Sequence, residues 1–134
     1  MPESMPVAAT ALYAALLALL QIALAALVGR ERIRSNISLG DGGDPALLEA
    51  IRRHANFLEQ VPLTLLLLAL LELNGASPVA IHGLGGTLLL VRLIHPFGLD
   101  SSEANRLPRL IGAAGTMLVQ LVAIAMLLWQ VVAG

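Results

Sequence analysis

The chain has 134 residues, of which 57% are hydrophobic, and a mean hydropathy of +0.83. This composition excludes an ordinary soluble domain and indicates an integral membrane protein whose length suits one domain. The formal net charge of −1 argues against a nucleic-acid partner. The absence of cysteine excludes disulfides, thiolate metal ligands and a thiol nucleophile supplied by the protein.

Four segments are apolar enough to span a membrane, which takes about 20 residues for a helix. They cover approximately residues 7–28, 56–73, 78–95 and 110–133. The first is preceded by Glu3 and by no basic residue, which predicts a retained span rather than a cleaved signal peptide. No strand-like alternation occurs. We therefore predict an all-α integral membrane protein, a four-helix bundle with left-handed up-and-down topology formed by a single domain over residues 1–134.

The connections indicate where the helices begin and where they pack closely. Residues 30–44 are predicted to form a polar loop, and Asp44-Pro45 then provides an N-cap followed by proline at the first helical position. The second helix should therefore begin near Pro45, ahead of its span, and Pro62 predicts a kink in it. Small residues in the third and fourth spans predict close helix contacts. They include Gly83, Gly85, Gly86, Gly112 and Gly115.

The arginines are distributed unevenly along the chain. All of them lie in or beside the first and third connections, and none lies near either terminus or in the connection 72–78. The positive-inside rule therefore predicts that the arginine-bearing end faces the cytoplasm and that both termini face the other side. The residues are Arg30, Arg32, Arg34, Arg52, Arg53, Arg92, Arg106 and Arg109.

Polar residues at this end have a regular spacing. Arg52, Asn56 and Glu59 follow i, i+4, i+7, so they share one face of a helix. Arg92 and His95 end the third span with i, i+3 spacing. Arginine binds carboxylates through paired hydrogen bonds, and a glutamate can receive an ammonium group. Arginines gathered around Glu59 therefore suit a small anionic ligand that carries one amine.

The same residues also have simpler interpretations. Arginines at the ends of spans commonly anchor helices to lipid headgroups. Glu59 could pair with Arg52 or Arg92 to hold two helices together. His54 and His95 lack the spacing typical of metal ligands, so we predict no metal site.

These motifs together resemble the MAPEG family, the membrane-associated proteins in eicosanoid and glutathione metabolism, and its bacterial branch in particular. The family pattern places arginine, asparagine, glutamate and proline at the start of the second span. The resemblance extends over nearly the whole chain, because four such motifs occur in the same order. The matching residues are Gly40-Asp41-Gly42-Gly43, then Arg52, Asn56, Glu59 and Pro62, then Arg92, His95 and Gly98, and finally Arg109, Gly112 and Thr116.

The resemblance implies a homotrimer with glutathione as co-substrate, bound between neighbouring subunits near the cytoplasmic boundary. Arg52, Asn56, Glu59 and His95 would hold the glutathione, Arg30 would reach it from the first helix, and Arg92 of the charged cluster would lie beside it. Arg109 would stabilise the thiolate. Arg106 is the alternative for that role, because the Leu107-Pro108 step leaves the start of the fourth helix uncertain by one turn.

We therefore predict a glutathione-dependent transferase or peroxidase of the bacterial inner membrane. Its lipophilic substrates would enter from the bilayer between the first and fourth helices. The alternative is a non-enzymatic protein of the same family that binds a membrane lipid or an amphipathic thiol. A channel fits less well, because Gln21 and Gln120 are the only other polar side chains deep in the spans.

Overall fold

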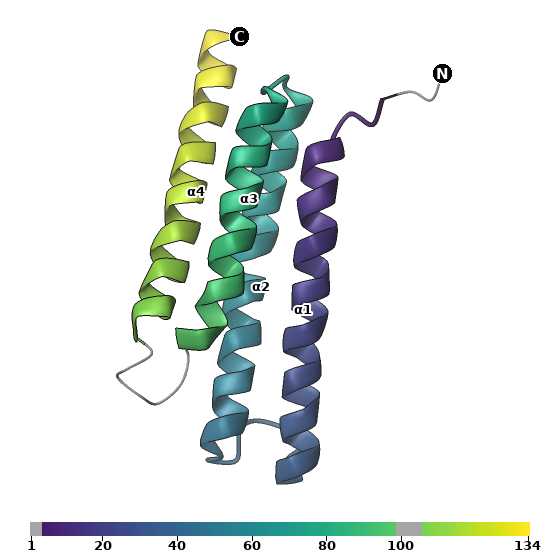
Figure 1. Cartoon of the computed structure of the whole chain (residues 1–134), viewed down its shortest axis with the longest axis vertical. Helices are drawn as coiled ribbons and strands as arrows, with labels where there is room; N and C mark the ends of the chain where they lie inside the picture. The colour runs from purple at the N-terminus through teal and green to yellow at the C-terminus, as the bar shows by residue number, and fades with distance from the viewer. Residues whose placement is uncertain (1–3, 99–105) are drawn as a thin grey trace.

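The computed structural model describes residues 4–98 and 106–134, without the side chains of residues 97, 98 and 106. The described residues form four α-helices and a short 3₁₀ turn, with no strand. The helices run alternately up and down, so both termini lie at one end of the bundle and the connection 36–44 lies at the other (Figure 1). This confirms the all-α four-helix bundle. The elements are α1 (Ala8–Ser35), α2 (Pro45–Leu73), α3 (Pro78–Ile94), η1 (His95–Gly98) and α4 (Arg106–Ala133).

Helices α2 and α3 occupy the centre of the bundle. Helix α1 packs against both of them from one side, and α4 packs against both from the other side (Figure 1). Helices α1 and α4 therefore lie on opposite flanks of a single chain. A path for a lipophilic substrate between α1 and α4, as expected from the sequence, does not exist within one chain and would have to be formed by two chains.

The helices differ in how fully they match a membrane span. Helices α1 and α2, and residues 107–133 of α4, are long and apolar enough to cross a bilayer. Helix α3 is a shorter apolar helix of 17 residues. At a rise of 1.5 Å per residue it covers about 26 Å, compared with roughly 30 Å for the hydrocarbon core.

Helix α1 continues beyond the predicted span, as far as Ser35. Its last turns carry the Glu31–Arg34 ion pair at i, i+3 spacing, and the helix ends at Asn36 in the left-handed conformation (φ 57°). Arg30, Arg32 and Arg34 are therefore helical rather than part of a loop. Helix α2 begins at Pro45, as predicted, and continues through Pro62.

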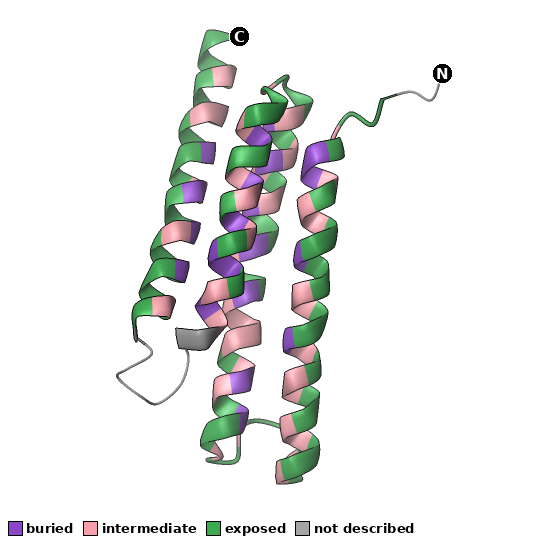
Figure 2. Cartoon of the chain, in the orientation of Figure 1, coloured by how far each residue is buried: buried purple, intermediate pink, exposed green. Residues whose placement is uncertain are grey.

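Buried side chains line the faces that the helices turn toward one another, while the outer faces are exposed and largely apolar (Figure 2). Lipid is as apolar as leucine, so burial of these side chains gives the helices little reason to associate in a membrane. Close packing and interhelical hydrogen bonds must supply the cohesion. The main core cluster contains Leu17, Leu24, Phe57, Val61, Leu88 and Val119.

A carboxylate from α2 caps the start of α1. Helix α1 has no side-chain cap of its own, because Val7 occupies the N-cap position. Glu72 instead accepts hydrogen bonds from the backbone N–H groups of Ala9 (3.0 Å) and Thr10 (2.8 Å) and from the Thr10 hydroxyl (2.6 Å). The negative charge also complements the positive end of the helix dipole. Two orphan donors are thereby satisfied where water is scarce.

Small residues set the distances of α3 from its two outer neighbours. Gly85 faces the ring of Tyr13 on α1, and the Tyr13 hydroxyl forms a hydrogen bond of 2.9 Å with His82 Nδ1. On the other side, Gly112 of α4 lies against the side chain and Cα of His95. A Cβ at either glycine would overlap these atoms, so the packing requires glycine there.

The deep glutamines link neighbouring helices. Gln120 of α4 donates to the Thr64 hydroxyl (2.9 Å) and to the Gln60 carbonyl (3.2 Å) of α2. Gln21 of α1 pairs with His54 of α2 across 3.0 Å. These amides therefore have a packing role, since each joins two helices within the apolar region.

We expect Glu72→Ala to lower the free energy of unfolding of the detergent-solubilised protein by about 2 kcal/mol, because the start of α1 loses charge-assisted hydrogen bonds. Glu72→Gln should cost less, since the amide oxygen can still accept. Glu49→Ala is the matched control: Glu49 pairs with Arg53 on its own helix at 3.9 Å, so a loss below about 0.5 kcal/mol is expected. Denaturant unfolding followed by circular dichroism measures each value. Equal losses for Glu72→Ala and Glu49→Ala would contradict the capping role.

A pair of glycine substitutions tests the packing of α3. Gly112→Ala should destabilise the protein by about 1–3 kcal/mol, because the new Cβ would lie 2.8 Å from the His95 Cα, which cannot move independently of the backbone. Gly83→Ala should be neutral or stabilise the protein by up to about 1 kcal/mol, because no atom would lie within 4 Å of the new Cβ and alanine favours the helix. Thermal unfolding in one detergent compares the two variants. Similar changes in stability for Gly112→Ala and Gly83→Ala would show that Gly112 does not pack tightly against His95.

The Asp44 carboxylate should make stability dependent on pH. Its hydrogen bonds from Arg34 (2.7 Å) and from the Leu47 N–H (3.0 Å) lower the pKa of Asp44 below its ordinary value. The stability that the ionised Asp44 contributes is therefore fully present above its ordinary pKa of about 3.9. It is lost as the pH falls through the lower pKa of Asp44 in the folded protein. Asp44→Asn keeps the cap but removes the charge. The stability difference between wild type and Asp44→Asn should stay constant from about pH 7 to 5 and shrink below about pH 4; a constant difference throughout would refute the ion pair.

Candidate functional site

A buried arginine forms the centre of the polar cluster at the arginine-bearing end. Arg92 lies in the last turn of α3, and its side chain is completely enclosed, with 1% of the residue exposed. Its Nη2 donates to Asn56 Oδ1 of α2 at 2.9 Å, and the guanidinium lies over the Phe57 ring, 5.6 Å from the centroid. Two of the predicted site residues, Asn56 and Arg92, are thus brought together, with an aromatic ring as support.

The hydrogen-bonding capacity of Arg92 is largely unused. Among the residues that the structure describes, neither its Nε nor its Nη1 has a partner, and no carboxylate forms an ion pair with it. A buried cation without a counter-charge costs several kcal/mol. Such a group is stable when an anion or a strong acceptor approaches its free N–H groups. The geometry therefore provides a recognition point for a carboxylate or another anion.

His95 extends this point along the same edge. It begins η1, one turn after Arg92, and is 2% exposed in the hollow left by Gly112 of α4. Its Nδ1 has no hydrogen-bond partner within the described part of the chain. Arg92 and Arg109 both lie within electrostatic range of the ring. A buried guanidinium and a buried imidazole with unused hydrogen-bonding atoms thus follow each other within one turn of the chain.

Three other predicted residues differ from this buried pair in their exposure. Arg52, Glu59 and Arg109 are exposed on the surface of the bundle. Glu59 forms no ion pair with Arg52 or Arg92, so the interpretation of Glu59 as a helix-packing ion pair finds no support among the described residues. Its carboxylate is free to meet a ligand or another chain.

One predicted residue, Arg30, pairs outside the cluster, and the side chain of another, Arg106, lies outside the described structure. Arg30 is exposed over 72% of its side chain and pairs with Glu31 of its own helix at 3.3 Å. Arg106 begins α4, but its side chain lies outside the described part of the structure, so it is not placed relative to Arg109. The surroundings of Gly98, another residue of the motif, also lie outside the described structure. For metal binding, no group of three or more suitable His, Cys, Asp or Glu residues occurs among the described residues.

Sequence reasoning missed the contributions of Phe57 and Glu72. Phe57 follows Asn56 directly in the sequence. Its cation–π contact is with Arg92 of α3, so it could be predicted only by knowing that α2 and α3 meet at this depth. Glu72 carries no local signal, because its partners Ala9 and Thr10 lie more than 60 residues away in the sequence. Both roles depend on which helices are neighbours.

Comparison with known proteins identifies the family. The sequence profile of the MAPEG family matches residues 10–129, which is most of the chain. Among curated proteins, the inner membrane protein YecN of Escherichia coli K12 is 40% identical over 89 residues, covering 66% of this chain and 68% of its own length. YecN of E. coli O6:H1 strain CFT073 matches to the same extent. No solved structure gave a significant match.

The fold and the comparisons agree. A helical bundle with membrane-spanning segments carries the motif order from Arg52 to Thr116, and the family profile covers all of these positions. This chain therefore belongs to the MAPEG family, which includes glutathione transferases and related membrane enzymes.

Proposed function

We propose that this protein is a glutathione-dependent transferase or peroxidase that acts on lipophilic electrophiles at the arginine-bearing end of the bundle. The observation that carries the proposal is the buried Arg92, whose Nε and Nη1 have no partner among the described residues, one turn before His95, whose buried Nδ1 is likewise unpaired there. The family supports it, because glutathione enzymes are among its members. The proposed location is a bacterial inner membrane, with the arginines on the cytoplasmic side.

The groups around Arg92 complement those of glutathione. Glutathione carries two carboxylates, one ammonium group and one thiol. Arg52 and Arg92 would each take a carboxylate, and the exposed Glu59 would take the ammonium group. The Asn56 amide already accepts from Arg92, so its N–H₂ group remains to donate to a peptide carbonyl of the ligand. The site therefore offers a partner for each polar end of the tripeptide.

Arg109 would supply the activation of the thiol. A nearby guanidinium favours the thiolate over the thiol and so lowers the thiol pKa. The thiolate sulfur would then form a bond to the electrophilic carbon, while the leaving group departs with its electron pair and the thiol proton passes to solvent. The protein would contribute positioning and electrostatic stabilisation, without a covalent intermediate of its own.

A single chain leaves this site half open. Arg52, Glu59 and Arg109 all face outward, so a ligand bound to them would be exposed on one side. A neighbouring subunit would cover it, which supports a homotrimer with sites between subunits. The same arrangement would bring α1 of one subunit near α4 of the next, and a lipophilic substrate could then reach the thiol from the bilayer.

The alternative is a non-enzymatic protein that binds a lipid or an amphipathic thiol at this site. One observation favours it: the only tyrosine, Tyr13, is bonded to His82 near the opposite end of the bundle, so no tyrosine hydroxyl assists the site. Binding would then require only the arginines, Asn56 and Glu59. Turnover, rather than affinity, distinguishes the two functions.

The first test is a titration of the detergent-purified protein with glutathione at pH 7, following the ultraviolet absorbance of the thiolate. We expect a saturable thiolate signal in the wild type. Arg109→Ala should keep most of the binding measured by calorimetry, lose the thiolate signal and lower the turnover of a lipophilic electrophile by about 10²-fold or more. Arg34→Gln is the control, because the partners of Arg34 are Glu31 and Asp44, and its turnover should match the wild type.

Other outcomes would redirect the assignment. If the thiolate signal disappeared in Arg106→Ala but not in Arg109→Ala, Arg106 would be assigned the activation of the thiol. Unchanged turnover in both variants would refute thiol activation by α4. Lipid binding without any glutathione signal at millimolar concentration would replace the enzyme by the non-enzymatic binding protein.

A further inference from the structure

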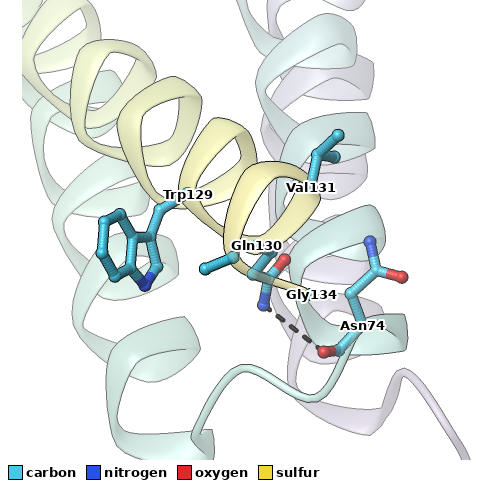
Figure 3. Close-up of a pocket in the computed structure, with 6 residues that line it drawn as sticks. Asn74, Trp129, Gln130, Val131 and Gly134 are labelled. Carbon is cyan, nitrogen blue, oxygen red and sulfur yellow. Dashed lines mark hydrogen bonds between the residues drawn. The ribbon is translucent and has the colours of Figure 1, made fainter.

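The end of the bundle opposite to the arginines contains a hollow made of two adjoining cavities, the first of which is drawn in Figure 3. They share Trp129 and Gln130, near the end of α4. The first, of about 500 Å³, is lined by Asn74, Trp129, Gln130, Val131, Ala133 and Gly134. The second, of about 430 Å³, is lined by Ala76, Ala125, Met126, Trp129 and Gln130. One part of the hollow is thus bordered by amide groups and the other part by apolar side chains.

The polar part requires a hydrogen-bond donor. Gln130 Nε2 donates to the backbone oxygen of Leu71 (3.3 Å) and to that of Asn74 (3.5 Å), where α2 ends; Figure 3 shows the bond to Asn74. These bonds commit the amide hydrogens, while Gln130 Oε1 is buried without a partner among the described residues. Gln130 lines both cavities, so this oxygen belongs to the wall of the hollow. A ligand that completes the network must therefore donate a hydrogen bond.

The charge of that ligand follows from its surroundings. No charged side chain lines either cavity, and all eight arginines belong to the other end of the bundle. The C-terminal end of α2 carries a partial negative charge from its aligned peptide dipoles. An anionic group would find no cation here, whereas a positively charged N–H group would find acceptors.

The apolar part offers room for hydrocarbon. Ala76, Ala125 and Met126 line it together with the indole of Trp129, which is 72% exposed. Tryptophan near the end of a span is typical of the boundary between lipid tails and headgroups. An amphipathic molecule with its head near Gln130 and its chain along Met126 would fit both parts.

We propose that this hollow binds a phospholipid with a primary ammonium headgroup, the phosphatidylethanolamine type. Its ammonium group would donate to Gln130 Oε1, and one acyl chain would occupy the apolar part. A choline headgroup has the positive charge but no N–H donor, and a glycerol headgroup leaves the phosphate charge without compensation. The site is separate from the glutathione site and stands without it.

The single tryptophan makes the test direct, because all tryptophan fluorescence of the chain comes from Trp129, which lines both cavities. The full chain is reconstituted in vesicles that contain equal mole fractions of brominated phosphatidylethanolamine, phosphatidylcholine or phosphatidylglycerol. The ethanolamine lipid should quench with a relative association constant roughly three- to tenfold above the choline lipid, the size expected for one net hydrogen bond. Equal quenching by all three lipids would overturn the proposal. If none of the three lipids quenched Trp129, as would happen if a second copy of the chain covered the hollow, the proposal would also be overturned.

Two variants localise the effect. Gln130→Leu keeps the tryptophan but removes the amide, so the preference should disappear; a retained preference would contradict the assigned acceptor. The double variant Trp129→Phe with Leu118→Trp moves the reporter about three turns along α4 to a position that is 60% exposed. That reporter should be quenched equally by all three lipids. Stronger quenching by the ethanolamine lipid at position 118 would show that the preference belongs to the vesicles, and it would refute the site. This control does not depend on whether Gln130→Leu folds.

Discussion

The structure depends on one constraint: within a bilayer, polar groups must find their partners inside the protein. Most of the deep polar side chains of this bundle satisfy it by joining helices, as Gln120 does with Thr64 and Gln21 with His54. Glu72 satisfies it for the backbone at the start of α1. These bonds also replace the hydrophobic effect as the source of cohesion, because the outer surface of each helix already faces an apolar solvent.

Against this background, unsatisfied buried groups become informative. Arg92 and His95 are almost completely enclosed, yet they keep hydrogen-bonding atoms without partners in the described part of the chain. A guanidinium in such a place is costly unless an anion joins it. The cost is consistent with a site that gains stability when its ligand binds. Gln130 shows the same pattern in a neutral form at the opposite end.

The two ends of the bundle therefore present opposite chemistry. The arginine-bearing end presents arginines and the exposed Glu59, and it would suit a zwitterionic ligand with excess negative charge. The other end presents amide and carbonyl acceptors beside the boundary residue Trp129 and suits an ammonium group attached to a lipid. In the proposed scheme, the distance between the two ends along the spans would keep the soluble co-substrate and the lipid from competing for one surface.

The sequence by itself determined the helical class, the start of α2 at Pro45 and the grouping of the arginines at one end, because hydropathy, capping and charge act locally along a chain. It also placed Arg92, His95 and Asn56 in one cluster, since the i, i+3 and i, i+4 spacings set the depth of each side chain. The family motifs added the glutathione hypothesis.

Only the tertiary structure decided which helices are neighbours. Glycines at 85 and 112 let α3 approach both α1 and α4, so α3 lies in the centre with α2 and the outer helices are separated. That arrangement buries Arg92 over Phe57, leaves Glu59 on the surface and assigns Glu72 to the start of α1. These outcomes depend on contacts between residues far apart in the chain, and a one-dimensional pattern carries no information about such distances.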